Sequence, residues 1–428
     1  MRSYLTDLRL FSRDARLYLI AVTIFAFGLA LPTAYSALYF NALGFDRTFI
    51  GVTTTAVLLG GAVLLPAAMW VLDRLGRRRA MLLGLALNWS LWSAAMLATN
   101  GMLILALLVL SGFGNVLYGL TVVPLLAEAS TQRERTSLFA AYEALITLSL
   151  FFGSLVAGVV PALVVLLMGL MPGSAEVYRV ALLSSLVIRA VGMLPLLRLS
   201  HRPVRDSFDE TRNSPQLLSS AKVLHYLNPR NLLKLRTPVI LFALPYALIF
   251  FASALVVPFL PLFLRADFAA TDADISTTLG IANLFIGVSS AVVPVMVGRF
   301  GRVWVVAGGC ALAALFALGM VVESNALWMV ALFIVLRAGV ANAIVPVYRA
   351  FTIDRAPVAE YTIVSLLLQL SANIGPAIAP PLSGIAQQRG GFLPVVVVCA
   401  ALFFVSAMLF AWVMKRAKTS GQSLEENA

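Results

Sequence analysis

Three ionisable side chains lie within long apolar segments, and they are the residues best placed to do chemistry. Glu143, Arg189 and Arg337 each interrupt a run of apolar residues. An arginine at the centre of a membrane-spanning helix costs about 2.5–3.5 kcal/mol on insertion scales, so it needs a polar cavity or a partner. The planar guanidinium of Arg337 suits the carboxylate, phosphate or carbonyl of a bound substrate. The alternative for Arg337 is a structural role, in an ion pair with Glu143 or at a helix C-terminus.

Glu143 is the only acid clearly inside an apolar run. Intramembrane carboxylates often take up and release protons, so Glu143 is the candidate for proton coupling. Its alternatives are a salt bridge or hydration near the lipid headgroups. Arg189 lies closer to the end of its run, where a long side chain can extend to the interface. A functional role is therefore less expected for Arg189 than for Arg337 or Glu143.

Neutral polar residues point to the same chemistry, the binding of a small polar solute. Gln369 and Asn373 are four residues apart and therefore share one helix face, and Asn115 lies in a polar stripe of another run. Tyr35 and Tyr246 lie on proline-interrupted runs. We expect these five residues, with Arg337, to contact substrate. The alternative is hydrogen bonding between helices, which is worth about 0.6 kcal/mol on average.

The composition shows what must position these residues. Of 428 residues, 61% are hydrophobic and 12% are charged, and the mean hydropathy is +0.95. Soluble domains carry about a quarter charged residues, and a single core stops growing near about 250–300 residues. The apolar surplus must therefore face lipid. This excludes a soluble enzyme, a disordered chain and a disulfide scaffold.

Other chemistries find little support in the sequence. Cys310 and Cys399 lie in apolar runs, and His201 and His225 are the only histidines. The sequence has no Gly-x-x-x-x-Gly-Lys-Ser/Thr phosphate loop. We therefore expect no metal, no cofactor and no enzyme activity. The net charge of +12 is better explained by membrane topology than by nucleic-acid binding, and we expect a monomer.

Twelve apolar runs are long enough to cross a bilayer, which needs about 20 residues per helix. Because they are long and do not alternate apolar with polar residues, they predict helices rather than strands. The expected fold is an all-α polytopic membrane protein with twelve transmembrane helices. The predicted spans are 17–39, 49–71, 80–99, 102–125, 137–160, 178–197, 238–263, 276–297, 303–321, 327–347, 361–384 and 392–414.

The basic residues predict the orientation. Placing the N-terminus inside puts most of the 31 Lys and Arg residues in cytoplasmic segments. The outside loops then hold Arg47, Arg265 and Arg389, with Arg179 at a boundary. Because Lys and Arg accumulate on the cytoplasmic side, both termini are expected in the cytoplasm of a cell-membrane protein.

The chain divides into two similar halves. We expect bundles at 1–198 and 238–415, a polar and basic cytoplasmic linker at 199–237, and a tail at 416–428. At an offset of 225 residues, Arg74 matches Arg299 and Gly76 matches Gly301, each in the turn after the second span of its half. Such internal repeats are typical of duplicated membrane bundles.

Residues 73–79 read Asp-Arg-Leu-Gly-Arg-Arg-Arg. This resembles the cytoplasmic signature loop of the major facilitator superfamily, Gly-x-x-x-Asp-Arg-x-Gly-x-Arg-Arg, and the resemblance extends over about residues 15 to 415. Three departures are Met69 at the first glycine, Gly298 at the second acid, and no Gly-Pro pair on the fifth helix. These departures weigh against drug–proton antiport more than against transport.

The resemblance implies a rocker-switch carrier whose two bundles alternate the access of a midplane cavity. It implies that the signature loop gates this change by stabilising the outward-open state, with Glu128 as a further member of the charge set. The expected gate residues are Asp73, Arg74, Gly76, Arg77, Arg78 and Glu128. The expected function is secondary active transport of a small organic solute, driven by a proton gradient, with export favoured. The alternatives are proton-coupled uptake of an anionic metabolite, or a sensor or membrane enzyme on the same fold.

Overall fold

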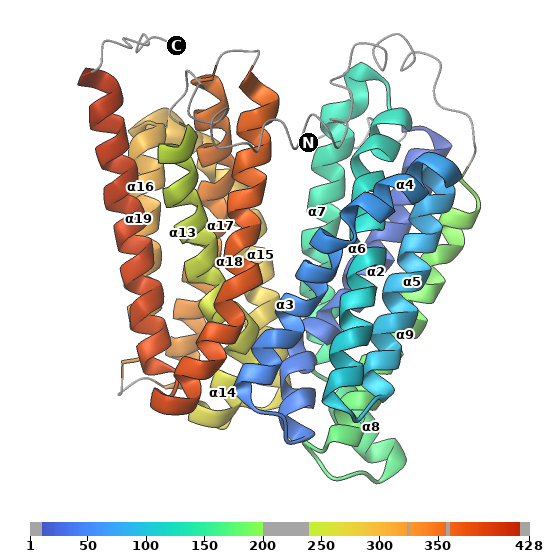
Figure 1. The fold of residues 1–428 in the computed structure, drawn as a ribbon. Coiled ribbons are helices and arrows are strands. Elements are labelled where there is room, and N and C mark those ends of the chain that lie inside the picture. The colour runs from blue at the N-terminus through green and yellow to red at the C-terminus, as the bar shows by residue number, and fades with distance from the viewer. Residues whose placement is uncertain (1–10, 200–238, 323–325, 357–359, 420–428) are drawn as a thin grey trace. The chain divides into compact units, whose positions relative to one another are not determined.

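The computed structural model describes residues 11–199, 239–322, 326–356 and 360–419, and in these ranges the secondary structure is helical (Figure 1). The expected linker at 199–237 lies, except for Leu199, outside the described residues. The tail is described only as far as Thr419.

The described residues in the first half of the chain form eight helical segments. They are α2 (Arg13–Ala42), α3 (Arg47–Val63), α4 (Leu65–Leu75), α5 (Arg77–Leu97), α6 (Gly101–Glu128), α7 (Gln132–Ala157), α8 (Val160–Met168) and α9 (Ala175–Leu197).

The described residues of the second half form seven α-helices and one 3-10 helix. Its segments are α13 (Val239–Val256), the short 3-10 helix η2 (Val257–Phe259), α14 (Leu260–Phe268), α15 (Asp272–Phe300), α16 (Arg302–Gly319), α17 (Leu327–Asp354), α18 (Tyr361–Gly390) and α19 (Leu393–Thr419).

These segments confirm the expected number of spans. Eleven helices in the described residues are long and apolar enough to cross a membrane, and α3 with α4 forms a twelfth span bent by 56°. The bend follows from Pro66, whose ring nitrogen cannot donate the helical hydrogen bond. Pro161 and Pro258 explain in the same way why α7–α8 and α13–α14 are interrupted.

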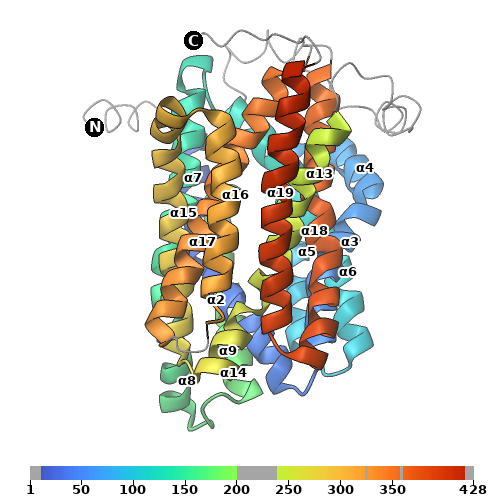
Figure 2. The ribbon, with the colours of Figure 1, turned by 90° about the vertical axis from the view of Figure 1, so that its left-hand side faces the viewer.

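The helices group into two compact units. Unit 1 comprises Met1–Leu217 with Pro261–Leu284, and unit 2 comprises Leu218–Leu260 with Phe285–Ala428. In unit 1, α2 packs against α7 and α9, and α6 packs against α3 and α5. In unit 2, α13 packs against α18 and α19, and α16 packs against α17 and α19, as Figure 2 shows for α16 and α19.

Glycines bring α3 and α6 of unit 1 into close contact. A Cβ atom added to Gly60 would lie 2.0 Å from the carbonyl oxygen of Val109, and one added to Gly112 would lie 2.2 Å from that of Val57. Small residues let membrane helices approach at the backbone, where packing stabilises them. Larger side chains at Gly60 or Gly112 would push α3 away from α6.

The repeated turns have the same backbone geometry. Gly76 after α4 has φ of 73°, and Gly301 after α15 has φ of 78°. Positive φ values suit glycine because it has no Cβ atom. The duplication inferred from the sequence is therefore visible in the turn conformation itself.

Within unit 1, a cluster of polar side chains joins helices of the first half of the chain to α14 and α15 of the second half. The Tyr35 hydroxyl donates to the carbonyl of Ala157 at 2.7 Å and lies 2.9 Å from the Ser276 hydroxyl. Nearby, Tyr178 donates to Asp272 at 3.1 Å, and Asp272 also pairs with Arg265. These contacts explain why α14 and the first part of α15 belong to unit 1.

Candidate substrate sites

The signature turn brings together part of the expected gate. Arg77 forms a salt bridge with Glu128, and Arg78 donates to the carbonyl of Leu197. Arg74 instead lies over the ring of Trp70, 4.6 Å from its centroid. The second copy forms the matching salt bridge between Arg302 and Asp354. In each half, the turn after the second span thus forms a salt bridge with the C-terminal end of the fourth span.

Asp73 stands apart from this set. Among the described residues none forms a hydrogen bond or ion pair with its side chain. The gating role that the resemblance gives to Asp73 stays a prediction.

Unit 1 contains a cavity of about 200 Å³ between α2, α5, α6, α7 and α9, with several polar side chains in a mainly apolar wall. Asn115, expected from the sequence to bind substrate, lines it from α6. Its side chain forms no hydrogen bond with a described residue. Other polar lining residues are Asn88, Tyr118, Tyr142 and Arg189.

Arg189 reaches this cavity because α9 passes close to α2. Its Cγ would lie 3.1 Å from a Cβ added to Gly28, so the glycine leaves room for the side chain. Arg189 is only 7% exposed, and its Nη2 has no hydrogen-bond partner. Its guanidinium carbon lies 6.0 Å from the ring centroid of Trp92. The side chain is buried in the bundle, which differs from the interfacial position expected for it.

The remaining cavity side chains are held by neighbours. The hydroxyls of Tyr18 and Tyr118 lie 3.3 Å apart, and the rings of Tyr18 and Tyr142 lie 6.2 Å apart. Asn88 donates from its amide to the carbonyl of Ser111 at 3.1 Å. Apart from Arg189, the polar side chains in the cavity wall are therefore neutral, and hydrogen bonds hold Tyr118 and Asn88 in place.

Unit 2 brings Tyr246 and Gln369 together through a residue that the sequence analysis missed. Arg349 donates from Nε to the Tyr246 hydroxyl at 2.7 Å and from Nη2 to Oε1 of Gln369 at 3.2 Å. Asn373 donates to the backbone carbonyl of Gln369 at 2.9 Å. Tyr246 is fully buried, whereas Arg349 is exposed. These residues come from α13, α17 and α18.

Arg349 was counted as a loop residue because the tenth run was expected to end at 347. The structure continues α17 to Asp354, through Pro346. The sequence signal that could have placed it on the helix is the pair of aromatic residues beside it, Tyr348 and Phe351, which extend the apolar run beyond 347.

Two other candidates lie outside both sites. Arg337 is 2% exposed and its Nε has no hydrogen-bond partner, but it lines neither the unit 1 cavity nor the polar cluster of unit 2. It lies near the thiol of Cys399. Glu143 follows the cavity residue Tyr142 on α7, is exposed, and its carboxylate forms no ion pair with a described residue.

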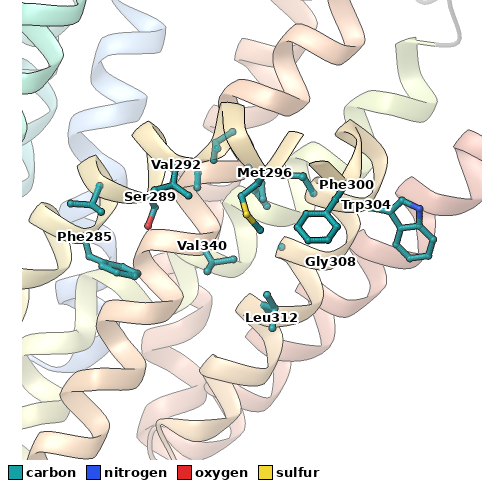
Figure 3. A pocket seen from close by; sticks show the side chains of 15 residues that line it. Phe285, Ser289, Val292, Met296, Phe300, Trp304, Gly308, Leu312 and Val340 are labelled. Atoms are coloured by element: carbon teal, nitrogen blue, oxygen red, sulfur yellow. The ribbon is translucent and has the colours of Figure 1, made fainter. Parts of the chain in front are cut away.

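Unit 2 also has an apolar groove of about 500 Å³ between α15, α16 and α17 (Figure 3). Val292 and Met296 line it from α15, and Gly308 and Leu312 line it from α16. Ser289 is the single polar side chain in its wall. None of the residues expected to bind substrate lines this groove.

The fold and the polar sites on its spans define a multi-pass membrane transporter. The family model of the Major Facilitator Superfamily matches residues 17–253 and 242–427. The chain therefore belongs to the Major Facilitator Superfamily, whose members are transporters and not enzymes. A search of curated protein sequences found no match.

Solved structures of transporters share this fold. The nucleoside transporter NupG matches with a TM-score of 0.73 and 16% identity, over 94% of this chain and 99% of that chain. A bacterial homologue of the human lysosomal transporter Spinster, in an inward-facing and unoccupied conformation, matches with a TM-score of 0.72 and 16% identity, over 96% and 98%.

A D-xylose–proton symporter matches with a TM-score of 0.68 and 12% identity, over 95% of this chain and 97% of that chain. At such identities the matches show the fold alone. They do not single out export or a substrate for this chain.

Proposed function

We propose that this protein is a secondary active carrier that moves a small organic solute across the membrane by alternating access. The observation that supports the proposal is the gathering of polar side chains on membrane-spanning helices in both units. Asn115 and Arg189 meet in the cavity of unit 1, and Tyr246, Arg349 and Gln369 meet in unit 2. Polar groups within membrane-spanning segments are costly, and solute binding explains their retention.

The proposed energy source is a proton gradient, with Glu143 as the coupling residue. Glu143 is exposed, directly follows the cavity residue Tyr142, and forms no ion pair with a described residue. A carboxylate in this position can exchange protons while the neighbouring cavity binds or releases solute.

The proposed orientation places the Gly76 and Gly301 turns in the cytoplasm of a cell-membrane protein. Arg74, Arg77 and Arg78 surround the first turn, and Arg299 and Arg302 surround the second. Basic residues concentrated in short loops are retained on the cytoplasmic side. The salt bridge between Arg77 and Glu128 would then break or form as access alternates.

Reconstituted protein tests the proposal directly. Solutes that stabilise the purified protein against heat are first identified from a metabolite panel, because ligands stabilise the state that they bind. Labelled forms of these solutes are then followed into proteoliposomes in both directions, with an imposed pH gradient and no ATP. We expect flux that follows the pH gradient. Flux that requires ATP, or no flux of any stabilising solute, would contradict the proposal.

The variant Glu143→Gln tests the coupling role within the same assay. We expect solute exchange between equal concentrations to persist, because it needs no net proton movement, while accumulation driven by the pH gradient is lost. An unchanged dependence of flux on the pH gradient would rule out coupling through Glu143.

A further inference from the structure

Arg189 is a buried cation for which the described part of the chain supplies no anion. It is 7% exposed, and no carboxylate of a described residue forms an ion pair with it. Its Nη2 lacks any hydrogen-bond partner. An uncompensated buried charge is strongly destabilising, so the arrangement needs an anion from elsewhere.

The cavity beside Arg189 is complementary to a single negative charge. The other polar residues in its wall, Asn88, Asn115, Tyr118 and Tyr142, are neutral and can donate hydrogen bonds, and no acid of the described ranges lines the cavity. A dianion such as a phosphate monoester would leave surplus negative charge there. A carboxylate carries one charge and two coplanar oxygens, which match the fork of a guanidinium.

The size of the cavity limits what enters. Its volume of about 200 Å³ lies below the range of about 300–1,000 Å³ that holds drug-sized ligands. Apolar side chains, among them Phe25 and Trp89, form the rest of the wall. The space therefore fits a small organic acid with an apolar body.

We propose that the unit 1 cavity binds the carboxylate of a small organic monoanion, with Arg189 as the charged contact and Asn115 as a neutral one. This names the substrate class of the carrier and rests on the function proposed above. Arg189 acts as a binding residue, and Gly28 provides the space that its side chain needs.

Matched pairs of probes test this proposal on the purified full-length protein. Benzoate, propionate and lactate are compared with benzamide, propionamide and lactamide, and with inorganic phosphate, by thermal shift and calorimetry. We expect at least one carboxylate to bind while its amide and phosphate do not. Equal binding of each acid and its amide, or binding of phosphate alone, would overturn the proposal.

Variants then assign the site. Arg189→Gln should weaken binding of that carboxylate by at least about 30-fold, as for loss of a buried charge contact. Arg189→Lys should give an intermediate loss, because lysine keeps the charge without the fork. Asn115→Ala should weaken binding several-fold and keep the preference for acid over amide, which preserves the test if Arg189→Gln does not fold.

Arg198→Gln is the matched control, because it removes one exposed arginine at the end of the same helix, outside the cavity. It should bind like the wild type. Unchanged affinity in Arg189→Gln would overturn the assignment even if transport of a neutral solute is observed. Carboxylate binding without any flux would instead contradict the transport function and leave the anion site standing.

A different observation carries a second inference, at the groove in Figure 3. Phe285 occupies the contact between α15 and α17, where a Cβ added to Gly339 would lie 2.2 Å from its Cδ1. Beyond this contact α15 packs little against α16 and α17, and only 17% of an 18-residue apolar stretch of α15 is buried. The result is the apolar groove, which is open on one side and whose lining extends to Phe300 and Trp304.

A cation with no anionic partner among the described residues lies at the end of this groove. The Arg299 guanidinium carbon is 5.6 Å from the ring centroid of Phe300, and Arg299 forms no ion pair with a described residue. Arg302 on the same turn is paired with Asp354. Trp304 is 76% exposed, as is typical of tryptophan at a membrane interface. The geometry points to an anionic phospholipid, with an acyl chain in the groove and its phosphate at Arg299.

Native mass spectrometry of protein from nanodiscs of phosphatidylglycerol or phosphatidylcholine tests this site. We expect retained phosphatidylglycerol in the wild type and its loss in Gly308→Phe, whose Cβ points into open space and would fill the groove. Arg299→Gln should abolish the preference over phosphatidylcholine. Leu318→Phe, on the same helix outside the groove, should behave like the wild type. Equal retention of both lipids, or retention unaffected by Gly308→Phe, would overturn the inference.

Discussion

Arg189 in unit 1 and Arg349 in unit 2 carry the same guanidinium group in opposite environments, one buried and one exposed. Arg189 is buried, and one of its nitrogens has no hydrogen-bond partner. Arg349 is exposed and donates to Tyr246 and Gln369. The buried guanidinium lacks a counter-charge and gains one when an anion binds, whereas the exposed one is already oriented by neutral partners. We therefore expect the cavity of unit 1 to select the charge of the solute, and the polar cluster of unit 2 to contribute to transport without selecting charge.

The largest expected effect comes from Arg189→Met. It removes the buried charge and should cost about 2–5 kcal/mol of carboxylate binding free energy. Without ligand, the unfolding temperature should equal or exceed that of the wild type, because an apolar side chain replaces an uncompensated charge. Calorimetry and thermal unfolding measure the two quantities. A variant that loses stability and keeps affinity would reverse the contrast between the two arginines.

Arg349→Gln should have a smaller effect of a different kind. It removes the hydrogen bonds to Tyr246 and Gln369 but no buried charge, so we expect transport to slow by about tenfold, the equivalent of about 1.4 kcal/mol. The preference for acids over amides should remain. Flux measured with matched acid and amide pairs checks this, and loss of acid selectivity here would show that unit 2 also reads charge.

Tyr246→Phe should have the smallest effect. It removes one hydrogen bond of Arg349 and leaves the bond to Gln369, and a typical net hydrogen bond is worth about 0.5–1.5 kcal/mol. Because Arg349 is exposed, we expect the lower end of that range. A flux reduced by about two- to threefold would sharpen the comparison, whereas a loss as large as that of Arg189→Met would contradict it.

The fold could be predicted from the sequence because the length of its apolar segments dominates it. Apolar length and the absence of alternation predicted twelve spans, and the matching turns at Gly76 and Gly301 predicted the duplication. The salt bridge of Arg77 with Glu128 could also have been predicted, since the predicted topology places both residues in cytoplasmic loops. Lipid imposes these constraints locally, so they can be read from local sequence.

The sites followed less well because position along a helix gives depth and not direction. Asn115, Tyr246 and Gln369 lie where polar groups meet, but Arg337 at mid-span lies near Cys399 and outside both sites. Arg189 was expected to extend to the interface, yet its side chain lies in the cavity, because Gly28 has no side chain to fill the space that it occupies. The position of such a side chain depends on which helices are neighbours, and the spacing of residues in a single sequence does not show this.

Tyr35 shows the same effect for a neutral residue. Its proline-interrupted helix predicted a substrate contact, and the structure gives its hydroxyl two partners, the carbonyl of Ala157 and the hydroxyl of Ser276. The residue thus fastens α15 to unit 1 in this structure, and its contact with substrate stays a prediction.

The central claim is that a solute carboxylate meets Arg189 during transport. Its most direct test is the accumulation of the bound carboxylate identified above in proteoliposomes under a pH gradient, for the wild type and Arg189→Met at equal protein incorporation. Accumulation by the wild type and none by the variant is the expected result. Equal accumulation by both proteins would contradict the claim.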